Sequence, residues 1–185
     1  MKVFRASADV NRYRYLLPAD TDAPGVYDFD GTPKEPWDPP EVYTYEPLLI
    51  AGDIWGYGMI ECTWAVSPGA FERLKWLLSD AGQLLPVPFE NELFTLLNVT
   101  ECVNCLDQDK TEWAIGETTG RRIRIERYAF HGERLPESSV FKIPETRRGE
   151  ILCYEGVKDP EDEFKPFVER HKITGLRFTE LWSSD

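Results

Sequence analysis

The sequence predicts an α+β protein, built from a mixed, mainly antiparallel sheet with one or two packed amphipathic helices. Three observations predict this class. Apolar segments rich in β-branched and aromatic residues recur along the chain and indicate strands. Only two segments have helical periodicity, and they do not alternate regularly with the strands as an α/β fold requires. Clusters of glycine, proline and aspartate separate the segments and indicate turns.

The first part of the chain is expected to be extended and interrupted by a long loop. Residues 3–17 are predicted to be extended. Residues 18–40 contain six prolines, which remove backbone donors and restrict the residues before them, so this segment is predicted to be a surface loop. Further strands are predicted at 42–55, with an irregularity at Pro47, and at 58–66.

The clearest helix begins at Ser67-Pro68, because serine favours the N-cap and proline the first helical position. Gly82 is predicted to end it. The pattern indicates an amphipathic helix lying on a sheet, since its apolar residues recur at helical spacing. These residues are Ala70, Phe71, Leu74, Leu77, Leu78 and Ala81.

The second part of the chain contains more strands and one short helix. Asp159-Pro160 can cap this helix, but Pro166 would kink its interior, so the regular part is predicted at 164–171. The elements together predict one domain over residues 1–185, or two sub-regions that meet near 107–120. The further strands are predicted at 93–106, 121–130, 138–143, 150–155 and 176–182.

The net charge of −12 is spread unevenly. Residues 1–113 hold 8 Lys/Arg and 19 Asp/Glu, a net charge of −11, whereas residues 114–185 hold 13 and 14, a net charge of −1. Phosphates require cations, so nucleic acid is not the expected ligand. An acidic surface is typical either of a protein whose charges are simply solvated or of one that binds a basic protein partner. No segment predicts a membrane helix or signal peptide, so a cytoplasmic protein is expected.

Cys102-Val-Asn-Cys105 is a C-x-x-C motif, which occurs in zinc sites and in redox pairs. The surrounding residues 93–106 indicate a strand, on which side chains three positions apart point to opposite faces. Cys62 and Cys153 are isolated in sequence. We therefore expect reduced, structural cysteines, with no metal and no cofactor.

Asp28-Phe29-Asp30-Gly31-Thr32 matches the signature of the aspartate-nucleophile phosphatases of the haloacid dehalogenase superfamily. That chemistry requires the first aspartate at the carboxyl end of a buried parallel strand that a helix follows. The prolines on both sides of the motif predict a turn instead. Because of this mismatch, a phosphohydrolase is kept only as the alternative function, and no catalytic residue is assigned.

The order of the segments resembles immunity protein family eleven, the myxobacterial-type immunity domain of bacterial polymorphic toxin systems. The likeness covers nearly the whole chain and rests on "YRYLLP", "WDPP", Gly52-Asp53, "SPGAFERLKWLL", "LLPVPF", "LLNVTECVNCLD" and "ITGLRFTELW". The chain departs from the family at its two cysteines, where small apolar residues are usual. The resemblance implies a non-enzymatic protein that binds a cognate toxin domain. It also implies core and turn roles for Trp37, Asp53, Leu106, Gly175 and Trp182.

Two acidic segments are the candidate toxin-binding surfaces. Residues 13–46 contain eight acids and only two basic residues, Arg14 and Lys34. The acidic side chains could occupy the phosphate site of a nuclease toxin, and the nearby aromatic residues are candidate binding hot spots. The same aromatic residues could instead fix the loop to the domain. The second segment, residues 159–163, could be a contact or the charged start of a helix. A binding module for another basic protein is a further alternative. The predicted toxin-binding residues are Tyr27, Asp28, Phe29, Asp30, Trp37, Asp38, Glu161, Asp162 and Glu163.

Overall fold

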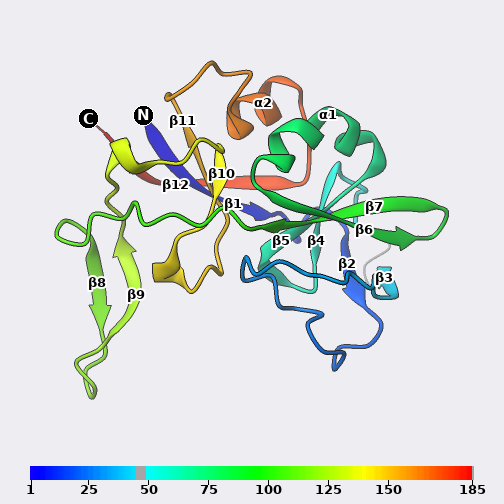
Figure 1. The fold of residues 1–185 in the computed structure, drawn as a ribbon, viewed down its shortest axis with the longest axis horizontal. Coiled ribbons are helices and arrows are strands. Elements are labelled where there is room, and N and C mark those ends of the chain that lie inside the picture. The colour runs from blue at the N-terminus through cyan, green and yellow to red at the C-terminus, as the bar shows by residue number, and fades with distance from the viewer. Residues whose placement is uncertain (45–48, 185) are drawn as a thin grey trace.

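The computed structural model describes residues 1–44 and 49–184, which form two sheets, a separate hairpin and two α-helices (Figure 1). One sheet has the strand order β10-β11-β1-β12 and the other the order β3-β2-β4-β5-β7-β6. Most strand pairs are antiparallel and β2–β4 is parallel, so the predicted α+β class is confirmed. The strands are β1 (Lys2–Ala8), β2 (Tyr15–Pro18), β3 (Val42–Thr44), β4 (Ile54–Tyr57), β5 (Ile60–Val66), β6 (Gly82–Phe89), β7 (Glu92–Val99), β8 (Glu112–Ile115), β9 (Arg122–Arg127), β10 (Val140–Phe141), β11 (Leu152–Glu155) and β12 (Leu176–Ser183).

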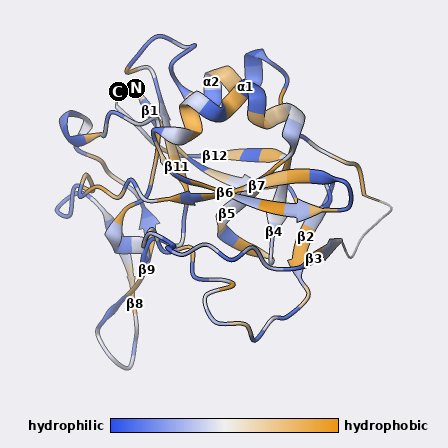
Figure 2. Cartoon of the chain, turned by 45° about the vertical axis from the view of Figure 1, so that its right-hand side comes forward, coloured by the Kyte–Doolittle hydropathy of each residue, from blue (hydrophilic) through white to orange (hydrophobic). Residues whose placement is uncertain are grey.

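Both predicted helices are present. Helix α1 (Pro68–Ser79) has Ser67 at the N-cap and proline at the first position, although the serine side chain forms no capping hydrogen bond. Figure 2 shows hydrophobic and hydrophilic residues mixed along this helix, as its amphipathic character requires. Helix α2 (Phe164–Arg170) has Glu163, rather than Asp159, at its N-cap. No helix among the described residues is long and apolar enough to cross a bilayer.

Three clusters of buried apolar side chains hold the fold together. The first lies between the sheets and the two helices, where the rings of Trp64 and Phe164 stack with centroids 5.4 Å apart. The second lies on the opposite face of the six-stranded sheet. Strand β7 serves both, because Phe94 belongs to the second cluster and Leu97 to the first, as side chains alternate across a strand. The third cluster lies on the four-stranded sheet, beneath the segment that leads to the β8–β9 hairpin.

Asp53 and Thr174 connect the two sheets. Asp53 Oδ2 accepts hydrogen bonds from the backbone N–H and the hydroxyl of Thr174, both at 2.8 Å, and Asp53 Oδ1 accepts one from Arg73 at 2.8 Å. Gly175 follows with φ +107°, and a Cβ there would lie 1.8 Å from the carbonyl oxygen of Ile54. Glycine is therefore required at position 175 for the close approach of β4 and β12.

Several predicted boundaries were wrong. Gly82 does not end α1 but begins β6, a strand that the prediction did not contain. The strand predicted at 93–106 ends at Val99, because the next two backbone N–H groups both donate to the carbonyl of Ala81 and turn the chain away from the sheet. The strand predicted at 42–55 is divided into β3 and β4. Pro47 and Glu46 lie outside the described residues.

Candidate functional site

The segment between β2 and β3, residues 19–41, forms the acidic loop. It covers the second cluster on the six-stranded sheet with two buried side chains, Val26 and Phe29. Phe29 is only 1% exposed, and its ring meets that of Tyr57 edge-on with centroids 5.6 Å apart. Burial of such a side chain stabilises a fold by roughly 1.5–3 kcal/mol. Phe29 therefore fixes the loop and cannot contact a partner in this conformation.

Polar contacts attach the acidic loop to the sheet at further points. Asn98 Nδ2 donates to the carbonyl of Thr32 at 2.9 Å, and the backbone N–H of Lys34 donates to Gln83 Oε1 at 2.8 Å. Trp37 Nε1 donates to the carbonyl of Pro86 at 2.8 Å, and its ring packs against the second cluster. The loop lacks regular structure but is held along its length.

A buried lysine lies directly beneath the acidic loop. Lys142 is 0% exposed, and its Nζ donates to the carbonyl oxygens of Phe29 and Cys62, the latter at 2.9 Å. Burial lowers the pKa of this amine from 10.5 to about 8, against the smaller opposing effects of Cys62 and Asp30. No sequence pattern indicates this contact, because Lys142 is distant in sequence from both partners.

The acids of the loop point into solvent. Asp30 Oδ1 accepts the backbone N–H of Thr32 at 2.9 Å, and this hydrogen bond lowers the pKa of the Asp30 carboxyl. Asp20 makes a similar contact with the N–H of Asp22 at 3.0 Å. Within residues 19–41, all of which the structure describes, no carboxylate is in an ion pair. The exposed acids are Asp20, Asp22, Asp28, Asp30, Glu35, Asp38 and Glu41.

The phosphatase-like motif lies within this loop. Asp28 and Asp30 are exposed on either side of the buried Phe29, and residues 19–41 contain neither strand nor helix. Asp28 is therefore not at the carboxyl end of a parallel strand, the position that fixes the nucleophile in aspartate phosphatases. Tyr27, which precedes the motif, is half-buried and packs against the second cluster.

The second acidic segment, residues 159–163, makes most of its contacts within the protein. Glu163 is 1% exposed and accepts the backbone N–H groups of residues 156–158 at 2.6–2.8 Å. Glu161 pairs with Arg170 and with His171 Nε2 at 3.1 Å, and the histidine contact is the largest cause lowering the pKa of its carboxyl. Asp162 remains exposed. Glu163 is thus an internal anchor rather than a contact residue.

The two acidic segments do not form one surface. In Figures 1 and 2 the acidic loop lies below the six-stranded sheet, whereas the segment before α2 lies beside the helices on the opposite side. The structure therefore brings together Tyr27, Asp28, Asp30, Trp37 and Asp38 and separates them from residues 161–163.

The C-x-x-C motif, Cys102 to Cys105, follows β7 and lies outside both acidic segments. Cys102 and Cys105 do not lie on a strand, so the argument from opposite strand faces was wrong. All four thiols are free, and burial raises the pKa of Cys105 to about 12. Among residues 1–44 and 49–184, no group of three or more histidines, cysteines or acids could hold a metal ion.

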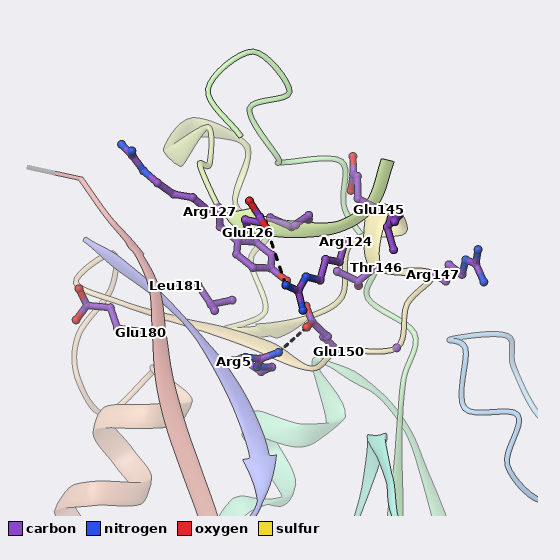
Figure 3. A pocket seen from close by; sticks show the side chains of 14 residues that line it. Arg5, Arg124, Glu126, Arg127, Glu145, Thr146, Arg147, Glu150, Glu180 and Leu181 are labelled. Carbon is purple, nitrogen blue, oxygen red and sulfur yellow. Dashed lines mark hydrogen bonds and ion pairs between the residues drawn. The ribbon is translucent and has the colours of Figure 1, made fainter. Parts of the chain in front are cut away.

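A hollow of about 1,020 Å³ lies between the β8–β9 hairpin and the four-stranded sheet (Figure 3). Its lining mixes arginines and glutamates. Arg5 pairs with Glu150 at 2.8 Å, and the Tyr128 hydroxyl donates to the same carboxylate at 2.6 Å. Burial, together with this contact, raises the pKa of Tyr128. The lining holds four arginines and four glutamates, so its formal charge of zero gives no preference for a ligand of either sign.

Comparison with protein-family models and with curated proteins finds no match to this chain.

Proposed function

We propose that this protein is an immunity protein, which binds a cognate bacterial toxin domain in the cytoplasm and neutralises it through the acidic loop. The observation that carries the proposal is a set of seven exposed carboxylates, none in an ion pair, on a loop fixed to the sheet. The order of the sequence segments, which resembles immunity protein family eleven, supplies the toxin as the class of partner.

Charge explains how such a loop would recognise its partner. Carboxylates without an ion-pair partner attract a basic protein over a distance of about 8 Å at physiological salt, and this attraction raises the association rate. A toxin that acts on nucleic acid needs cations at its phosphate site. The acidic loop would occupy that site and exclude the substrate.

The attachment of the loop keeps the cost of binding low. A flexible segment loses conformational freedom when it binds, which subtracts from the affinity. Here Phe29, Trp37 and Lys142 already hold the loop in one conformation. The carboxylates are thus pre-positioned for a partner.

Growth rescue tests this function. Co-expression with the product of the adjacent gene should protect the cell, and replacing four of the loop acids in D28N/E35Q/D38N/E41Q should reduce protection. These positions avoid Asp30, whose carboxylate caps Thr32. The matched control, E90Q/E92Q/D109N/E117Q, removes as many exposed acids elsewhere and should still protect.

Failure of the wild-type chain to protect against that product would refute the toxin assignment. Equal loss of protection in the control and loop variants, with both folded, would refute the assignment of the loop. Binding of a basic protein without protection would favour the more general binding module.

A further inference from the structure

A hollow of about 420 Å³ lies within the acidic loop itself. This volume is near the lower end of the roughly 300–1,000 Å³ of small-ligand pockets, so it has room for a partner side chain rather than a folded element. Much of the lining is apolar. It includes Pro24, Pro36, Pro39, Pro40 and Trp37, together with Asp38.

The apolar wall of this pocket is preformed. The indole N–H of Trp37 donates to Pro86 at 2.8 Å, which fixes the ring against the edge strand β6. Proline fixes its own φ and lacks a backbone N–H, so the segment around Trp37 has few alternative conformations and few donors to offer a ligand. The wall therefore suits an apolar or flat group.

Two carboxylates and one ammonium group lie at the pocket, so the net charge of −1 favours a cation. Asp38 is exposed and in no ion pair, and the carboxylate of Asp28 lies beside Gly25, where an added methyl group would be 3.9 Å from its Oδ2. Lys34 also lines the pocket and keeps its positive charge, and its Nζ would lie 3.8 Å from the same added methyl group. Its Nζ donates to the carbonyl of Gly25 at 2.8 Å and lies 4.7 Å from the centre of the Phe29 ring.

We propose that this pocket receives an arginine side chain of a basic protein partner. The stem would pack on Trp37 and the prolines, and the guanidinium would approach Asp38. Arginine fits better than lysine because its planar, weakly hydrated head stacks on aromatic and apolar surfaces. The identity of the partner as a toxin rests on the proposed function, but the pocket and its preference do not.

The test uses Nα-acetyl-arginine N-methylamide and its uncharged analogue, Nα-acetyl-citrulline N-methylamide, which has nearly the same shape. Each is titrated into the ¹⁵N-tryptophan-labelled protein, and the Trp37 indole resonance, assigned with the W37F variant, is followed by NMR. We expect a saturable shift with arginine and at least about fivefold weaker binding of citrulline. D38N should weaken arginine binding up to about fivefold, the upper end of the range for one exposed charge pair, and D109N should not.

Equal binding of the two compounds, or an unmoved Trp37 resonance at millimolar arginine, would overturn the pocket. Growth rescue separates this result from the proposed function. Protection without a Trp37 shift leaves the function and removes the pocket, whereas a Trp37 shift without protection leaves the pocket and removes the toxin as partner.

Discussion

Replacement of Lys142 by methionine should make the stability difference between wild type and variant depend on pH. Burial lowers the pKa of this amine from 10.5 to about 8 in the folded protein. Between these values the unfolded chain binds a proton that the folded chain does not, so the wild type gains stability as pH rises. K142M lacks this proton and should not show the gain.

The magnitude follows from the two pKa values. Keeping the buried amine charged costs the fold about 3 kcal/mol below pH 8, and this cost disappears as pH rises towards 10.5. Between pH 7.5 and 9.5 the free energy of unfolding of the wild type should rise by about 2 kcal/mol relative to K142M. The neutral amine retains two N–H donors for the carbonyls of Phe29 and Cys62, so the contacts can survive deprotonation.

Urea unfolding at pH 7.5, 8.5 and 9.5 measures this difference, because titrations common to both proteins cancel. K75M, which removes an exposed lysine of α1, controls for the loss of a lysine as such. A difference that stays flat or falls as pH rises would refute the assignment of Lys142 as a buried amine beneath the loop.

Two further predictions concern anchors away from the acidic loop. E163Q should lower the free energy of unfolding by about 2 kcal/mol, because the charged carboxylate accepts three backbone N–H groups; an unchanged urea midpoint would contradict this role. G175A should cost about 3 kcal/mol or more, because its Cβ would meet the carbonyl of Ile54, whereas G120A, with φ +63° in open space, should cost about 1 kcal/mol. Thermal unfolding compares the two glycine variants, and equal costs would argue against the close approach of β4 and β12.

The sequence predicted elements whose pattern reports local structure. The apolar periodicity of α1 and the extended pattern of β12 were sufficient, because each depends on neighbouring residues. Strand β6 was missed although Leu85, Val87 and Phe89 alternate with Pro86 and Pro88. Proline argues against a central strand, but β6 is an edge strand, where the missing N–H groups face away from the partner.

The site depended on contacts between segments distant in sequence. Composition predicted an acidic loop with aromatic anchors, and the structure gives its aromatic residues different roles: Phe29 is buried, whereas Trp37 lines an open pocket. Glu163 belonged to an acidic run by sequence and lies in the interior, because backbone N–H groups surround it. Sequence patterns could not predict which aromatic residue of the loop is buried, nor that Glu163 is buried. They also could not predict that Lys142 lies beneath the loop.

The most direct test of the central claim is the affinity of the purified cognate toxin domain, measured by calorimetry, for the loop variant D28N/E35Q/D38N/E41Q. Exposed charge pairs contribute roughly 0.2–1 kcal/mol each, so loss of four should weaken binding at least about fourfold, with unchanged melting temperature. The control E90Q/E92Q/D109N/E117Q should bind as the wild type does. Equal affinity of the loop variant and the wild type would contradict recognition through the acidic loop.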